Sequence, residues 1–351
     1  MQKKRFILPI FLLIQVIGLK ILSFFPEFVE KYYSNGLYPY ISKFSRIILG
    51  GIPFSIGDVL YVILIIYSLY WLYKNWKINW KQKVLSILSL VSVFYFLFNF
   101  LWAINYHRVP LFKKMNIETE YSDAQLMVFT KKIIAKTNEV QFRMANDTAK
   151  KIINPFTQKQ IFEKSIIGYN NLSKEYLFFT YNKQSIKKSL FSYPLTYMGF
   201  GGYLNPFTNE AQVNSMIPKY GFPMTTCHEM AHQMGYASES ECNFIGFLAV
   251  TKNDNLYFKY SGYSFALRYC LSNWEVRNPK VLKQLLKTIH PGVLKNFKES
   301  EDFWESHKTF IDTGFKIFYD NFLKFNQQKD GLESYSKFVN LMVSYYETKE
   351  L

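Results

Sequence analysis

Residues 84–104, VLSILSLVSVFYFLFNFLWAI, form an unbroken apolar stretch without a charged side chain. A helix of about 20 mostly apolar residues is long enough to cross the hydrocarbon core of a bilayer. The alternative is a buried helix of a soluble core, but soluble helices are rarely apolar on every side over such a length. We therefore predict that this stretch spans a membrane.

Two further apolar runs precede it. Residues 6–25, FILPIFLLIQVIGLKILSFF, are interrupted by Gln15 and Lys20, and residues 56–73 contain the run VLYVILIIYSLYWLY. The sequence thus predicts three N-terminal transmembrane helices, at about 6–25, 56–73 and 84–104. Aromatic residues expected at the membrane–water interface lie at the ends of these runs: Trp71, Tyr73, Trp76, Trp80 and Trp102.

The first run also has the basic start of a signal peptide, Lys3-Lys4-Arg5. It lacks an A-x-A-like cleavage site and two more spans follow it, so we predict that it is retained. Cleavage of this run is the alternative interpretation.

Basic residues in the connections predict the orientation. The N-terminal tail carries three of them, and loop 74–83, KNWKINWKQK, carries four lysines and no acid. In residues 26–55, which we interpret as a loop, three bases are offset by Glu27 and Glu30. Cytoplasmic loops are enriched in Lys and Arg. The prediction is a multi-pass protein of the inner (cytoplasmic) membrane, with residues 105–351 outside the cytoplasm.

The net charge favours a lipid bilayer as partner over nucleic acid. The 351 residues contain 42 Lys and Arg against 26 Asp and Glu, a net charge of +16. Half of this excess lies in residues 1–104, where 11 basic residues are balanced by only three acidic ones. No zinc knuckle, RNP-like signature or dense basic tract is present. The mean hydropathy of −0.06 therefore averages an apolar front and a polar remainder.

Residues 105–351 contain no Pro/Ser-rich linker and no internal repeat, and we interpret them as one domain. Helical periodicity predominates, and residues 301–325 predict one long helix. Residues 176–184 and 195–214 are rich in aromatics, Gly and Thr, and predict strands with turns. The fold class is therefore mainly α, with three spans before a mostly helical α+β domain. The three cysteines are too few for a disulfide framework, and we expect buried free thiols: Cys227, Cys242 and Cys270.

The chemically informative segment is residues 225–244, TTCHEMAHQMGYASESECNF. It contains the HExxH pattern from His228 to His232, which rarely arises by chance in a chain with five histidines. On a helix, residues four apart project from one face, so both imidazoles reach one metal ion. Glu229 is offset toward a metal-bound water. We predict a Zn²⁺ site with His228 and His232 as ligands and Glu229 as the catalytic residue.

Residues 226–234 predict a short helix that begins after Pro223, with Thr225 or Thr226 as its cap. His228, Glu229 and His232 also have a purely structural interpretation. Glu229 would then close a capping box with Thr226, and the histidines would be ordinary core residues. Two of the chain's five histidines flank this glutamate at the HExxH spacing. This pattern favours the metal site over the structural interpretation.

A catalytic zinc has three protein ligands and one open position. Gly235 can end the helix with a positive φ and turn the chain back, and Ser238 can cap the next helix. The nearby carboxylates are Glu239, which shares a face with Asn243, and Glu241, which completes an S-x-x-E capping box. We predict Glu239 as third ligand, with Glu241 as the alternative. Asn243 is predicted to orient a ligand.

Five longer stretches of the sequence carry a family resemblance. They are GGIPFSIGDVLY (50–61), FLWAINYHRVPL (100–111), GFGGYLNPFTNEAQVN (199–214), HEMAHQMGYASESECNF (228–244) and YDNFLKFNQQKDGLESY (319–335). With them, nearly the whole chain resembles the uncharacterised bacterial membrane proteins of domain-of-unknown-function family 3810 (DUF3810), whose activity is itself inferred from the HExxH motif.

More distantly, the arrangement resembles gluzincin-type membrane zinc peptidases, in which an E-x-x-x-D after HExxH supplies the third ligand. This resemblance implies a zincin-like domain and supports Glu239 over Glu241. Asn243 stands where that group has Asp, and only six residues separate His232 from Glu239, which departs from the spacing of that group.

The expected function is a membrane-anchored zinc metallopeptidase that hydrolyses peptide bonds of envelope proteins or peptides. Zinc would activate a water, Glu229 would move its proton, and residues 199–214 would pair with an extended substrate. Candidates for the oxyanion donor are Tyr197, Tyr203, Tyr263, His290 and Tyr335.

The alternative function is a non-catalytic, membrane-anchored binding or assembly protein with a structural zinc. Structural sites are usually closed by four protein ligands, often thiolates. Cys227 and Cys242 lie close enough in sequence to join such a site.

Overall fold

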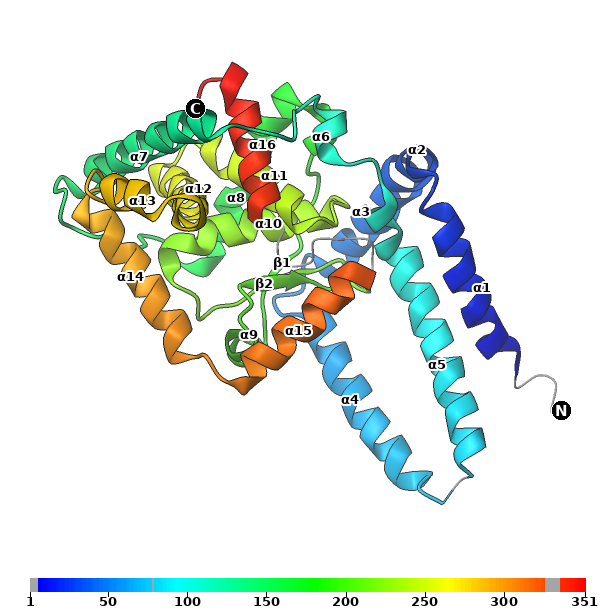
Figure 1. Ribbon diagram of the computed structural model, residues 1–351. Coiled ribbons are helices and arrows are strands. Elements are labelled where there is room, and N and C mark those ends of the chain that lie inside the picture. The colour runs from blue at the N-terminus through cyan, green and yellow to red at the C-terminus, as the bar shows by residue number, and fades with distance from the viewer. Residues whose placement is uncertain (1–5, 78, 326–334) are drawn as a thin grey trace.

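The computed structural model describes residues 6–77, 79–325 and 335–351, and helices predominate in it (Figure 1). The helices and strands are, in order, α1 (Ile7–Leu22), α2 (Pro26–Phe28), the π-helical η2 (Val29–Leu37), α3 (Tyr38–Leu49), α4 (Ile56–Lys74), α5 (Trp80–Leu101), the 3₁₀ turn η3 (Ala103–His107), α6 (Leu111–Lys114), α7 (Asp123–Ala145), α8 (Gln158–Glu175), η4 (Leu177–Phe179), β1 (Ile186–Lys188), α9 (Ser192–Tyr197), β2 (Gly202–Leu204), β3 (Ala211–Val213), η5 (Lys219–Gly221), α10 (Phe222–Gln233), α11 (Glu239–Thr251), α12 (Leu256–Arg277), α13 (Pro279–Leu286), α14 (Pro291–Ser306), α15 (Phe310–Phe325) and α16 (Tyr335–Thr348).

Two helices, α4 and α5, are long and apolar enough to cross a membrane. Each begins at a side-chain cap, Ser55 for α4 and Asn79 for α5. Few of their side chains are buried within the protein, and Figure 1 shows both helices projecting away from the part of the chain that follows α5. They correspond to the predicted helices at 56–73 and 84–104, and mark the chain as a membrane protein.

Helix α1 packs along α5 (Figure 1). The side chain of Gln15 donates hydrogen bonds to the carbonyl and hydroxyl oxygens of Ser92, at 3.2 and 3.1 Å. After α1 the chain bends by 100° into the helical segment Pro26–Leu49. Counting this bent pair as one span gives up to three spans, so the third predicted span stays a prediction.

Residues 26–55 were interpreted as a loop from their sequence, and this interpretation was wrong for most of the segment. They form α2, η2 and α3, whose buried side chains include Val29, Tyr33 and Tyr38. These three pack with Trp102 in a small apolar cluster. The segment lacks a long apolar run because only one face is buried. Trp102 is likewise buried and packs inside the protein.

Helix α11 lies at the centre of the remaining domain. Residues 244–250, FIGFLAV, have no exposed side chain, because α8, α10, α12 and α16 pack around them. A helix that is apolar on every side requires such surroundings. The outer helices α7 and α8 each begin with a capping box, built by Ser122 with Gln125 and by Thr157 with Gln160.

Two predicted elements of this domain were wrong in part. Residues 301–325 do not form one helix, because α14 ends at Ser306 and α15 starts at Phe310. Residues 176–184 contain the 3₁₀ turn η4 rather than a strand. The aromatic content that predicted a strand there reflects burial instead, since Phe179 and Tyr181 lie in the hydrophobic core.

A three-stranded sheet of order β1-β3-β2 packs against α10 (Figure 1). Strand β1 runs parallel to β3, and β2 runs antiparallel to it, with Tyr203 opposite Gln212. Strands β2 and β3 fall within residues 195–214, as predicted, whereas the beginning of that range belongs to α9. The mainly helical fold with a small sheet before the HExxH helix is thus confirmed.

Candidate metal centre

Helices α10 and α11 bring the HExxH residues and Glu239 together. Helix α10 begins at Phe222, with Pro223 in its first turn, so the predicted caps at Thr225 and Thr226 were wrong. The Thr226 hydroxyl instead donates to the carbonyl of Phe222 at 2.8 Å. After α10, Gly235 has φ +86° and turns the chain toward α11, as predicted. A Cβ at this glycine would lie 2.8 Å from the ring of Tyr38, so both conformation and space require Gly.

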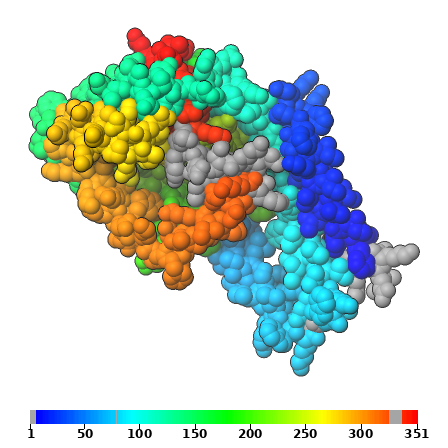
Figure 2. Space-filling view, in the orientation of Figure 1, coloured from blue at the N-terminus to red at the C-terminus, as the bar shows by residue number. Residues whose placement is uncertain are grey.

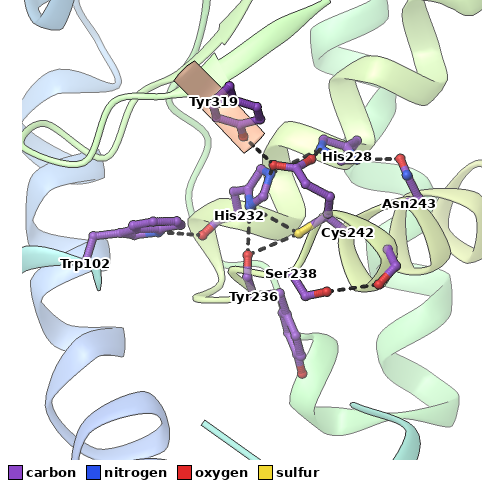
Figure 3. Close-up of polar contacts among 10 residues, drawn as sticks. Trp102, His228, His232, Tyr236, Ser238, Cys242, Asn243 and Tyr319 are labelled. Atoms are coloured by element: carbon purple, nitrogen blue, oxygen red, sulfur yellow. Dashed lines mark hydrogen bonds and ion pairs between the residues drawn. The ribbon is translucent and has the colours of Figure 1, made fainter. Parts of the chain in front are cut away.

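Three predicted ligand side chains meet in this arrangement (Figure 3). The Nε2 atoms of His228 and His232 lie 3.1 Å apart. The carboxylate of Glu239 lies 3.1 Å from Nε2 of His228 and 3.7 Å from Nε2 of His232. The ligand atoms are all within 4.8 Å of one another. This separation suits a single ion bound by two imidazoles and a carboxylate.

The other ring nitrogen of each histidine is occupied. Nδ1 of His232 donates to the carbonyl oxygen of Tyr236 at 2.8 Å, and Nδ1 of His228 lies 2.8 Å from Oδ1 of Asn243 (Figure 3). In each ring Nε2 is therefore the nitrogen that points toward the other histidine and toward Glu239. Two imidazole nitrogens and a carboxylate oxygen that converge in this way form a donor set that fits a metal ion.

Glu241, the alternative third ligand, points elsewhere. Its Oε1 accepts the backbone N–H of Leu111 at 2.6 Å, and burial raises its pKa. It is not among the described side chains that gather at the centre. The predicted capping box at the start of α11 was also wrong, because Ser238 makes no cap hydrogen bond and pairs with the hydroxyl of Ser240 instead.

Glu229 lies beside the ligands under strand β2. Its Oε1 is so close to Gly202 that a Cβ there would lie 2.7 Å away. Its Oε2 is buried and has no hydrogen-bond partner among the described residues. Burial raises the pKa of Glu229 to about 7, against the lowering influence of the two histidines. An unpaired buried carboxylate oxygen at this place suits contact with a polar ligand. The predicted capping box with Thr226 does not form.

The pKa of Glu239 moves in the opposite direction. Burial alone would raise it, but the neighbouring His232 and His228 outweigh burial and hold this pKa well below its ordinary value. Glu239 is therefore the more acidic carboxyl group of the centre, and Glu229 is the one that binds a proton more readily. Two carboxylates with separated pKa values are typical of a division between metal binding and proton transfer.

Tyr319 of α15 completes the centre, and the sequence did not single it out. Its hydroxyl donates to Oε1 of Glu239 at 2.7 Å (Figure 3). Burial, with the neighbouring Glu239, raises the pKa of Tyr319 well above its ordinary value, so the phenol stays a proton donor. One signal was available, because Tyr319 opens the family-like stretch 319–335.

The five candidates for an oxyanion donor have other partners or lie outside the described part. Tyr203 donates to Asp58, Tyr197 pairs with Tyr193, and Tyr263 is buried against Phe247. His290 lies 2.8 Å from the side chain of Gln141. The side chain of Tyr335 is not among those described.

The membrane-proximal segments hold the C-terminal end of α10. Tyr38 and Ser42 of α3 donate to the carbonyl of Gln233, at 3.1 and 2.8 Å. Nε1 of Trp102 donates to the carbonyl of His232 at 3.3 Å (Figure 3). These last carbonyls of a helix have no partner within it, so they need donors from elsewhere. Segments on both sides of the predicted boundary at residue 105 therefore build this part of the centre.

The sheet is attached to α4 by two buried carboxylates. Glu210, the residue before β3, accepts the N–H groups of Ile56 and Gly57, at 3.2 and 2.6 Å, and so caps α4. Asp58 accepts hydrogen bonds from Tyr203 of β2 and from the backbone of Leu190, the latter at 2.6 Å. Apart from Leu190, the residues that make these contacts lie within the family-like stretches 50–61 and 199–214.

The cysteines are buried free thiols in the structure, as predicted. Sγ of Cys242 lies 3.2 Å from Nδ1 of His232, on the side of the ring that faces away from the ligand cluster. Neither Cys242 nor Cys227 belongs to the described group of side chains that is placed to share a metal ion.

A family model described as "Protein of unknown function (DUF3810)" matches residues 33–343. No curated protein and no solved structure matches the chain.

Proposed function

The chain belongs to the DUF3810 family of proteins of unknown function, and we propose that it is a membrane-anchored zinc metallopeptidase, with gluzincin-like residues in a zincin-like domain. The observation that carries the proposal is the meeting of two Nε2 atoms and the Glu239 carboxylate within 4.8 Å, beside the unpaired carboxylate oxygen of Glu229. His228, His232 and Glu239 would hold the ion, and a fourth position stays open for water or substrate.

Bound zinc would supply Lewis acidity, which polarises a carbonyl and lowers the pKa of a coordinated water. Glu229 would take the proton of that water and pass it to the leaving amine, a role that suits a carboxylate with a pKa near 7. Asn243 and the carbonyl of Tyr236 keep the imidazoles oriented. Tyr319 is placed to donate a proton or a hydrogen bond at the same centre.

Strand β2 would bind an extended peptide at its free edge. The carbonyl of Gly201 accepts the N–H of Asn214 at 2.9 Å, and the N–H of Asn205 donates to the carbonyl of Glu210 at 3.0 Å, so both ends of β2 are bonded to the residues that flank β3. Because antiparallel ladders alternate, the peptide groups of Gly202 and Leu204 face the other edge of β2. A substrate strand added at this edge would pass next to Glu229. We propose peptides or proteins of the cell envelope as substrates, because the basic loop 74–83 favours an extracytoplasmic domain.

The test compares the wild-type protein with Glu229→Gln, both purified as full-length chains. Elemental analysis should find zinc in both, because Glu229 is not a ligand. Cleavage of envelope peptides, followed by comparing the peptide termini in cells producing each form, should fall by about 10²–10⁴-fold in Glu229→Gln. His228→Ala should lose zinc as well as cleavage.

Loss of zinc or of folding in Glu229→Gln would instead favour the second candidate, a binding or assembly protein with a structural zinc. The arrangement of the described thiols gives that candidate little support, since Cys242 approaches the ring nitrogen of His232 that faces away from the ligand cluster.

A further inference from the structure

Helix α15 has two apolar faces. On its inner face, Phe315 and Tyr319 pack against the ring of Phe200, at centroid distances of 5.7 and 4.9 Å. Leu323 on the same face is fully buried. This face covers the metal centre, because Tyr319 reaches Glu239 from it.

The outer face of α15 exposes four large apolar side chains. Phe310 is 86% exposed, Ile311 44%, and Ile317 and Phe318 60% each. Helical spacing places all four on one stripe. Exposed apolar residues elsewhere in the described part of the domain are mostly isolated, such as Val276. A helix that is apolar on both faces is typical of contact with protein on one side and with lipid on the other.

Side-chain contacts link the two ends of α15 to the end of α5 and, through α9, to the start of α4. Near its C-terminal end, Phe322 contacts Phe98 in the last turn of α5, at 6.1 Å. Just before its N-terminal end, His307 contacts Tyr197 of α9, at 5.3 Å. Helix α9 follows Leu190, whose N–H is bound by Asp58 in the first turn of α4. The start of α4 and the end of α5 lie on one side of the membrane, because consecutive spans run in opposite directions.

The connection between β2 and β3 packs against the apolar side chains of both spans near this helix. The ring of Phe207, in the β2–β3 connection, lies between Tyr61 of α4 and Phe94 of α5, at 6.4 and 6.0 Å. Leu190 and Tyr193, between α4 and α15, are also exposed. An apolar surface therefore continues from the spans toward the outer face of α15, which Figure 2 shows at the surface of the molecule beside the spans.

We propose that α15 is an interfacial helix whose outer stripe of Phe310, Ile311, Ile317 and Phe318 inserts into the headgroup–acyl boundary of the bilayer that holds α4 and α5. Lys316 and Lys324 lie off this stripe, each about half exposed and paired with an acid of the same helix, Asp312 at 3.0 Å and Asp320 at 2.7 Å. The occupant is lipid, argued from the continuity of this surface with the spans. The proposal does not depend on zinc or on peptidase activity.

The test uses the full-length chain in nanodiscs of phosphatidylcholine and phosphatidylglycerol. Phe318→Cys carries a nitroxide spin label, and its accessibility to oxygen, which partitions into lipid, is compared with its accessibility to a water-soluble nickel chelate. The native thiols of Cys227, Cys242 and Cys270 are buried, with pKa values raised to about 12, and stay unlabelled at neutral pH. Ile65→Cys on α4 is the lipid control and Glu301→Cys on α14 the water control.

The expected result is that the label at 318 resembles the label at 65, with oxygen accessibility exceeding that of the nickel chelate. A label at 318 that behaves like the one at 301 would overturn the proposal. Protection from both reagents would also overturn it, because another protein surface, such as a second copy, would then cover the helix. Ile317→Cys repeats the measurement, and unchanged thermal unfolding shows that each variant is folded.

Discussion

The side chains of the metal centre are held in place by contacts that lie behind them. Asn243 and the carbonyl of Tyr236 each occupy one Nδ1 atom, and Tyr319 occupies one oxygen of Glu239. Such outer contacts fix the tautomer and the direction of a ligand, and their loss typically weakens metal binding by about 10–100-fold. The affinity for zinc is therefore expected to depend on residues that do not touch the ion.

Tyr319→Phe removes the hydroxyl that donates to Glu239 and keeps the ring that packs on Phe200. We expect the variant to fold and to bind zinc about 10–100-fold more weakly, as measured by competition with a chelator. Tyr193→Phe is the matched control, because Tyr193 is exposed and bonds only weakly to Tyr197, at 3.3 Å. Equal zinc affinity in both variants would contradict the role given to Tyr319.

The ligand cluster could be predicted from the sequence because it is local. His228 and His232 share a helix face, and the turn at Gly235 returns Glu239 to them within one helix–turn–helix unit. Tyr319 could not be predicted in the same way, since it is 80 residues from Glu239. Its place depends on how α15 packs on Phe200, which no local pattern of the sequence specifies.

At the scale of elements, strand β2 and helix α10 approach each other closely. A Cβ at Gly202 would lie 2.6 Å from the carbonyl of Gln212 and 2.7 Å from Glu229. A neighbouring position, Gly201, has more room, since its Cβ would be 3.4 Å from a methyl group of Thr225. The strand therefore needs glycine at one of these two positions and tolerates a side chain at the other.

Gly202→Ala is expected to destabilise the fold by about 1–3 kcal/mol through overpacking, and to displace Glu229. Its cleavage rate should fall more than its thermal stability alone explains. Gly201→Ala should leave both nearly unchanged. Thermal unfolding and the envelope-peptide assay measure the two effects, and similar behaviour of the two variants would argue against a close contact between β2 and Glu229.

The elements that the sequence predicted well are those with long apolar runs. Helices α4 and α11 have uniform apolar or buried character, and both were expected. Segment 26–55 was misinterpreted because its helices are short and bury one narrow face. The strands are three residues each, too short to show an alternating pattern.

At the scale of the whole molecule, the N-terminal apolar helices and the C-terminal domain interlock. The carbonyls at the end of α10 accept donors from α3 and from Trp102, while Glu210 caps α4 from the sheet. Arg108 adds a donor to the carbonyl of Gly235, at 2.8 Å, and pairs with Glu30 at 2.9 Å. The boundary at residue 105 was predicted from hydropathy. Hydropathy reflects how apolar each segment is, and it carries no information about these polar contacts between segments.

Combining Ser42→Ala with Trp102→Phe removes two donors to α10. Each hydrogen bond contributes about 0.5–1.5 kcal/mol, so we expect the unfolding free energy to fall by roughly 1–3 kcal/mol and zinc to dissociate faster. Ser89→Ala is the control, because the hydroxyl of Ser89 bonds only within α5. The double variant would contradict this view if it released zinc at the wild-type rate.

The orientation of the chain in the membrane is also a property of the whole molecule. Because loop 74–83 carries four lysines and no acid, we expect it in the cytoplasm and Leu351 outside. Alkaline phosphatase fused after Leu351 should therefore be active, whereas the same enzyme inserted in loop 74–83 should be inactive. The reverse pattern would refute the orientation and, with it, an extracytoplasmic peptidase.

The hydrogen bond between Tyr38 and Gln233 also has a consequence for biosynthesis. Its partners are 195 residues apart, so the spans must enter the membrane long before α10 has been made. Until then, the hydroxyls of Tyr38 and Ser42 lack the carbonyl of Gln233 to which they donate in the complete fold. The candidate metal centre can therefore form only late in translation, and a chain that stops before residue 222 lacks all of its predicted ligands.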